Sequence, residues 1–184
     1  MRLKRPSNRF IFAVTGIFGV FLIIFGEVFL YWQSRILSFS TDPYEGVQST
    51  VLANFLPKRI NIASAGIDLP IEEGKIVGGV WQISNTTATH LINSQVPGQN
   101  GNIVIYGHNL RNIFGKLVDV KKGDIIDLFT NDGKKYEYKV SDISKVEPTD
   151  IGVVAPTNYQ ILTIYTCTSF LDSQRLVVKA LPLS

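Results

Sequence analysis

The 184-residue sequence contains a single cysteine and only two histidines, and each scarcity excludes a class of protein. With Cys167 alone, no disulfide can form within the chain, so a disulfide-stapled secreted domain is excluded. One cysteine and two histidines also fall short of the clustered ligands that a zinc site needs. Glu72, Glu73 and Asp150 leave a loosely bound Ca²⁺ open, but no EF-hand-like loop is present, and the sequence indicates no cofactor.

Excess positive charge is missing from most of the chain, although its formal net charge is +3. Residues 1–9 carry four basic side chains and no acidic one, which predicts a short basic tail. Residues 33–184 carry 14 basic and 14 acidic side chains and are therefore neutral overall. A domain that binds nucleic acid needs a concentrated basic surface. The charge distribution thus excludes nucleic acid as a partner.

One long hydrophobic run stands near the N-terminus. Residues 10–32 contain one ionisable side chain, Glu27, and at about 1.5 Å per residue they can cross a hydrocarbon core of about 30 Å. A signal peptide would have a shorter apolar stretch and a small-residue cleavage site, which this segment lacks. Tyr31 and Trp32 supply interfacial rings, and the basic tail favours a cytoplasmic N-terminus. We expect a single-pass anchor in the lipid of the cell membrane, with residues 33–184 extracellular.

Short segments of β type dominate the extracellular part. Residues 33–60 show no sustained periodicity and are expected to form a stalk, whereas residues 61–184 alternate apolar runs with turn signals. Residues 102–107 and 161–167 are nearly continuous apolar runs, as expected of central strands covered on both faces. No extracellular stretch has a convincing helical period, and residues 90–95 are the only one that could form a short helix. The pattern predicts a mainly β domain, closed or sandwiched, of about seven short strands.

The single cysteine stands at the end of an apolar run. Residues 168–174 connect this run to the next one, which begins at Arg175. If the two strands pair antiparallel across this connection, Cys167 and Arg175 face each other at one end of the domain. His108 follows the other buried run, but spacing alone does not bring it close to Cys167.

A thiol, an imidazole and a guanidinium suit acyl transfer. The thiolate attacks, the imidazole protonates the departing amine, and the guanidinium donates to the oxyanion. Two other interpretations stay open. In the first, Cys167 is a buried structural residue of a membrane-tethered β-barrel binding module. In the second, the protein is a cysteine protease, in which water hydrolyses the acyl-enzyme. His90 lies in a polar segment and is expected to be structural or solvated.

Four blocks of the sequence resemble the sortase family, the membrane-anchored cysteine transpeptidases of mainly Gram-positive bacteria. The T-L-x-T-C signature of that family appears here as Thr163-Ile164-Tyr165-Thr166-Cys167, with isoleucine in place of leucine. An arginine eight residues after the cysteine and a histidine at the end of an apolar strand complete the pattern. The blocks follow the family's order and are residues 97–109, 114–130, 162–167 and 174–180.

The resemblance implies a closed eight-stranded β-barrel with short helices over residues 61–184. It assigns Cys167 as the nucleophile, His108 as the general acid and base, and Arg175 as the oxyanion donor, while Thr166 would line the substrate site. The implied reaction cleaves an LPXTG-like sorting signal of an exported protein through a thioester. The protein then passes to an amine acceptor, which is a peptidoglycan precursor or a pilin lysine.

The resemblance also raises the question of a lid over the active site. Pilus-type sortases carry an Asp-Pro-aromatic lid, and the sequence from Asp42 to Tyr44 matches that pattern. Asp-Pro followed by a large residue is also an ordinary turn sequence. We therefore expect a plain turn at these residues in preference to a lid.

Overall fold

The computed structural model describes most of the chain, and its described residues are 16–28, 53–77, 80–168 and 173–183. The chain divides into two compact units, Met1–Arg35 and Ile36–Ser184. The first unit contains a helix over residues 16–28. Among the described residues, no helix has both the length and the apolar character needed to cross a membrane.

Parts of the expected N-terminal organisation lie outside the described residues. These parts are the basic tail of residues 1–9 and both ends of the expected span, residues 10–15 and 29–32. Asp42 and Tyr44, the residues of the lid pattern, also lie outside the described residues.

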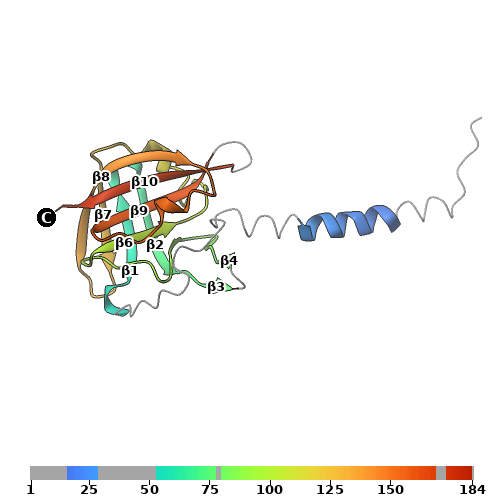
Figure 1. Cartoon of the computed structure of the whole chain (residues 1–184). Helices are drawn as coiled ribbons and strands as arrows, with labels where there is room; N and C mark the ends of the chain where they lie inside the picture. The colour runs from blue at the N-terminus through green and yellow to red at the C-terminus, as the bar shows by residue number, and fades with distance from the viewer. Residues whose placement is uncertain (1–15, 29–52, 78–79, 169–172, 184) are drawn as a thin grey trace, which may run out of the picture. The chain divides into compact units, whose positions relative to one another are not determined.

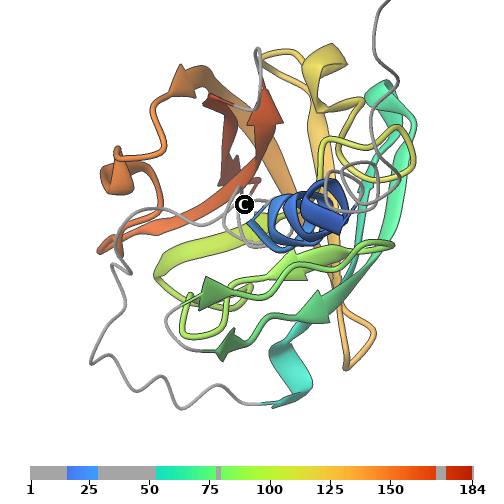
Figure 2. The same cartoon turned by 90° about the vertical axis from the view of Figure 1, so that its right-hand side faces the viewer.

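Eight strands of the second unit close into a β-barrel, which confirms the mainly β, eight-stranded fold expected from the resemblance (Figure 1). Neighbouring strands follow the order β1, β2, β5, β6, β9, β10, β8 and β7, and β7 pairs with β1. Two short strands, β3 and β4, form a separate sheet, drawn in green in Figure 2. The strands are β1 Pro57–Ile62, β2 Ile67–Glu73, β3 Ile76–Val77, β4 Val80–Trp81, β5 Ala88–His90, β6 Gly101–Tyr106, β7 Ile125–Thr130, β8 Lys135–Val146, β9 Gln160–Thr168 and β10 Gln174–Pro182. The 3-10 turns are η1 Ala53–Phe55, η2 Ala63–Ala65, η3 Leu117–Asp119 and η4 Ile151–Val153.

Strands β6 and β9 are buried on both faces, as their continuous apolar runs predicted. Successive side chains of a strand point to opposite faces of the sheet. Ile103, Ile105 and Ile164 therefore pack in the barrel interior. Val104 and Tyr165 point the other way and belong to a second apolar cluster on the outer side of the barrel wall. The wall formed by β6, β9 and β10 thus separates two cores.

The second cluster is closed on its outer side by residues that belong to no barrel strand. Trp81 and Leu91 come from the chain on either side of the β4–β5 connection, and Val153 and Val154 come from η4 and the residue after it. All four side chains are buried. The outer face of the β6–β9–β10 wall is therefore a covered surface, and Cys167 lies on this face.

Two local predictions differ from the structure. Strand β1 begins at Pro57, four residues before the domain start that we expected at residue 61. The short helix expected over residues 90–95 is wrong, because β5 ends at His90 and a turn follows. Asn93 has a φ of 72°, in the left-handed region that asparagine tolerates better than most residues and that an α-helix cannot contain.

Candidate active site

Cys167 and Arg175 lie directly opposite each other on neighbouring strands. Strands β9 and β10 pair antiparallel, as the length of their connection predicted, and the register matches Cys167 with Arg175. Directly opposed residues share one face and have Cα atoms about 5 Å apart. Cys167 is two residues beyond Tyr165, so both residues of the pair point to the covered outer face.

Strand β6 brings His108 to the same edge of the barrel. Strands β6 and β9 pair in parallel, with Tyr106 matched to Tyr165. His108 and Cys167 each lie two positions past this pair, Cys167 on β9 and His108 just beyond the end of β6, and neighbouring strands are about 4.8 Å apart. The N–H of Gly107 donates to the Tyr165 carbonyl at 3.4 Å, which extends the pairing toward His108. The fold therefore places the imidazole-bearing residue beside the cysteine, which sequence spacing alone did not settle.

The turn that carries His108 is tied to β9 by a side chain. Thr166 Oγ1 donates to the Gly107 carbonyl at 2.8 Å, so Thr166 fixes the distance between the two strand ends. A Cβ atom on Gly107 would lie 2.9 Å from Ile113 Cγ2 and 3.0 Å from Phe114 Cδ2, which explains why glycine precedes the histidine. The role that the resemblance assigns to Thr166, lining the substrate site, stays a prediction.

The cysteine and the arginine are nearly inaccessible to solvent. Each side chain is 2% exposed, whereas His108 is partly exposed. Arg175 Nη1 donates to the Gln174 carbonyl at 3.3 Å. Burial raises the pKa of Tyr165 well above its ordinary value, the neighbouring Tyr106 adds to this rise, and the charge on Arg175 opposes it. Arg175 and Cys167 are thus opposed in a part of the wall that is almost closed to solvent.

A second group of side chains has the order of a Ser-His-acid triad, which the sequence did not reveal. The Nδ1 of His90 donates to Glu73 Oε2 at 2.9 Å, and His90 Nε2 lies 3.0 Å from Ser94 Oγ. Ser94 is fully buried, and its hydroxyl oxygen accepts the N–H of Val104 at 3.3 Å. A substrate cannot reach this hydroxyl, so the group ties β2, β5 and β6 together and is structural. His90 itself is fully buried, which excludes the solvated alternative.

We expect replacement of His90 by alanine to lower the free energy of unfolding by about 2–4 kcal/mol, because Glu73 and Ser94 lose a buried partner. Chemical denaturation followed by circular dichroism measures this change. Arg59→Ala, which breaks an exposed ion pair with Asp68, is the control and is expected to change stability little. Equal stability of the His90 variant and the unmodified chain would contradict the structural role.

No group of three or more histidine, cysteine, aspartate or glutamate side chains is placed to hold a metal ion among the described residues.

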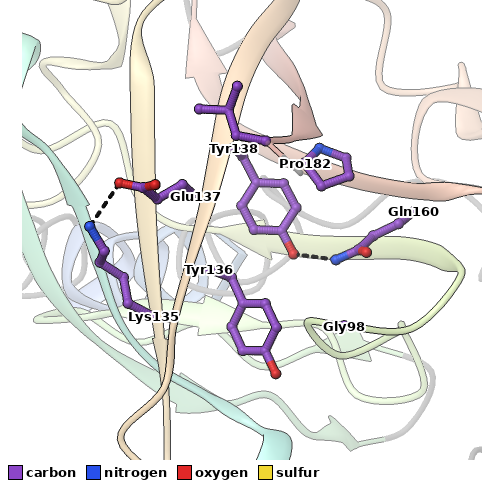
Figure 3. Close-up of a pocket in the computed structure, with 8 residues that line it drawn as sticks. Gly98, Lys135, Tyr136, Glu137, Tyr138, Gln160 and Pro182 are labelled. Carbon is purple, nitrogen blue, oxygen red and sulfur yellow. Dashed lines mark hydrogen bonds and ion pairs between the residues drawn. The ribbon is translucent and has the colours of Figure 1, made fainter.

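A pocket of about 520 Å³ lies at the other end of β9 (Figure 3). It is bordered by the first half of β8 and by Gln160, the first residue of β9. Within it, Gln160 Nε2 donates to the Tyr138 hydroxyl at 2.7 Å, as the dashed line in Figure 3 shows. Gln160 and Cys167 are seven positions apart on β9, a distance of about 23 Å along a strand. The pocket is therefore remote from the cysteine.

Comparisons with known proteins agree with the resemblance in the sequence. The family model described as a sortase domain matches residues 60–183. Sortase A of Bacillus anthracis is 32% identical over 129 residues, which cover 66% of this chain and 57% of that protein. The chain spans less than two thirds of the length of the curated relatives that it matches.

Solved structures show the same likeness in three dimensions. Sortase A from Corynebacterium diphtheriae superposes with a TM-score of 0.62 at 26% identity, covering 86% of this chain and 82% of that chain. Sortase C-1 from Actinomyces oris gives a TM-score of 0.62 at 25% identity, with 82% and 87% covered. With the family model matching most of its length, the chain belongs to the sortase family.

Proposed function

We propose that this protein is a membrane-anchored cysteine transpeptidase that cuts a sorting signal in exported proteins and joins them to an amine. The observation that carries this proposal is the register that sets Arg175 opposite Cys167, at the barrel edge where β6 delivers His108. Membership of the sortase family supports the same reaction class. The signal is an LPXTG-like peptide, and the acceptor is the amine of a peptidoglycan precursor or a pilin lysine.

The reaction has two halves, and each residue has a part in both. Cys167 Sγ attacks the threonine carbonyl of the signal, and Arg175 donates to the oxyanion that forms. The threonine–glycine bond breaks as His108 protonates the leaving amine, which leaves a thioester on Cys167. The acceptor amine then attacks the thioester, His108 takes its proton, and the thiolate departs.

Incubation of the full chain in detergent with a sorting-signal peptide and a primary amine tests the proposal. We expect mass spectrometry to show the amine adduct of the peptide fragment and a thioester-linked enzyme. Product formed by hydrolysis alone, at every amine concentration, would favour a cysteine protease. Absence of both product and thioester across a library of sorting-signal peptides would favour a binding module with a structural cysteine.

We also propose that the first unit anchors the protein in the cell membrane, with the N-terminus cytoplasmic and the barrel extracellular. The helix of residues 16–28 supports this, because its large apolar side chains are more than half exposed, including Ile17 at 71% and Ile23 at 68%. A helix that is apolar all round requires an apolar environment, such as lipid or a protein interior. The basic tail favours the cytoplasmic side for the N-terminus.

We expect the full chain, expressed in a bacterium, to stay in the membrane pellet after an alkaline carbonate wash. A chain that lacks residues 1–32 is expected to appear in the supernatant, because it loses the whole hydrophobic run. Immunoblotting of both fractions measures the distribution. Retention of the shortened chain in the pellet would contradict the assignment of the anchor to this run.

A further inference from the structure

The thiol of Cys167 is covered in the structure, so a peptide can reach it only after something moves. Cys167 is 2% exposed and shares its apolar cluster with Trp81, which is also 2% exposed. Trp81 begins the segment of residues 81–83, which we name the covering segment. Ile83, at the other end of this segment, packs against the same cluster. The covering segment therefore packs on the outer face of the barrel wall, the face that also carries Cys167.

One side chain of the barrel wall holds this segment in place. The hydroxyl of Tyr106 donates to the carbonyl of Gln82 at 2.7 Å. The ring of Tyr106 stacks on Tyr165 with centroids 5.5 Å apart and planes within 14°. The same ring also contacts Trp81 at a centroid distance of 5.8 Å. Tyr106 thus links the covering segment to Tyr165, which lies two residues from Cys167.

The covering segment is also tied to the chain that precedes it, where Trp81 pairs with Ile76. The N–H of Gln82 donates to the Lys75 carbonyl at 2.7 Å, and the N–H of Gly74 donates to the His90 carbonyl at 2.8 Å. Gly74 fits closely beneath Tyr106, because a Cβ atom there would lie 2.9 Å from the tyrosine hydroxyl oxygen. The Tyr106 hydroxyl therefore supplies the hydrogen bond that joins the barrel wall to the covering segment.

The hydroxyl keeps its proton over the physiological range. Burial, reinforced by the nearby Glu73 carboxylate, raises the pKa of Tyr106 above its ordinary value. Tyr106 consequently remains a hydrogen-bond donor to Gln82 under the conditions in which the enzyme works.

We propose that Tyr106 is a positioning residue whose hydrogen bond to Gln82 holds the covering segment over Cys167, and that release of this bond opens the substrate route. When only a fraction of the molecules has the open, binding-competent conformation, the apparent Kd equals the intrinsic Kd divided by that fraction. Weakening the bond therefore raises the open fraction without touching the reacting groups.

The first test measures access to the thiol and needs no catalysis. The full chain in detergent is labelled with a small maleimide, whose rate on Cys167 follows the open fraction when opening is fast. Tyr106→Phe removes the hydroxyl and keeps the ring. We expect the rate of labelling to rise about five-fold, because the loss of one hydrogen bond changes an equilibrium constant by about this factor.

Tyr138→Phe is the matched control, because Tyr138 is fully buried and its hydroxyl accepts a hydrogen bond at the remote pocket. We expect labelling of this variant at the unmodified rate. Equal labelling of the Tyr106 variant and the unmodified chain would overturn the proposal. An equal rise in both phenylalanine variants would also overturn it, because general loosening would then explain the effect.

The second test separates access from chemistry and rests on the proposed function. With a sorting-signal peptide, Tyr106→Phe is expected to lower KM about five-fold and to leave kcat unchanged. A fall in kcat with an unchanged KM would overturn the positioning role, because Tyr106 would then act on the reaction itself. If no peptide turns over, the proposed function fails while the labelling result still decides this inference.

Discussion

Replacing Cys167 by alanine is expected to abolish transpeptidation, with a loss of at least about a thousand-fold in kcat. No other described residue offers a thiol, so neither the thioester nor the second half of the reaction can occur. Cys167 packs at the outer face of β9, and alanine fits this space, so the variant is expected to fold. Mass spectrometry of the enzyme after mixing with a sorting-signal peptide measures the thioester directly.

Thr168→Ala is the matched control for this experiment. Thr168 is the next residue of β9, and because neighbouring side chains alternate between faces, it points away from the face that carries Cys167. We expect this variant to keep most of its activity and to form the thioester. Full turnover by the Cys167 variant would remove the cysteine from the mechanism and would favour a binding module that carries a structural cysteine.

Local signals in the sequence were sufficient for one half of the site. A seven-residue connection between two apolar runs allows antiparallel pairing, and this predicted that Cys167 and Arg175 face each other. The pairing of β6 with β9 is different in kind. It is parallel and joins strands more than fifty residues apart in sequence, so it depends on closure of the whole barrel. The position of His108 beside Cys167 therefore could not be predicted from spacing.

Burial by distant segments was the other feature that the sequence did not predict. Trp81 comes from a short strand outside the barrel and lies in the same buried cluster as Cys167, and no local pattern in the sequence predicts this. The polar neighbours of His90 likewise favoured exposure, yet Ser94 and Glu73 are its hydrogen-bond partners in a buried network. Polar residues close to a histidine in the sequence can therefore be its hydrogen-bond partners in a buried network, and they do not by themselves indicate exposure to solvent.

Arg175→Lys is expected to lower kcat about a hundred-fold while changing KM little, because it tests geometry at constant charge. The guanidinium presents fixed donors in a plane, and a lysine ammonium offers one mobile point charge. Removal of one oxyanion donor costs about 10²–10³ in kcat in other enzymes. Arg175 lies opposite Cys167, so a shorter or misdirected donor misses the oxygen that becomes charged when Sγ attacks.

The control must separate this loss from simple damage to the fold. Arg175 is 2% exposed, and a lysine in its place is more strongly hydrated and so costs more to bury, which lowers stability. Denaturation midpoints of both proteins measure that cost, and kcat is compared only at temperatures where both are folded. Lys145→Ala, which removes an exposed cation on the neighbouring strand β8, shows the effect of net charge alone.

Three results of this experiment have distinct meanings for the arginine. A hundred-fold fall in kcat with a normal KM, together with a normal rate for the Lys145 variant, supports donation to the oxyanion. A rise in KM with an unchanged kcat would mean that Arg175 binds the signal in its ground state and does not stabilise the transition state. An unchanged rate would remove Arg175 from the mechanism and leave the charge beside Cys167 as a purely structural feature of the β9–β10 pair.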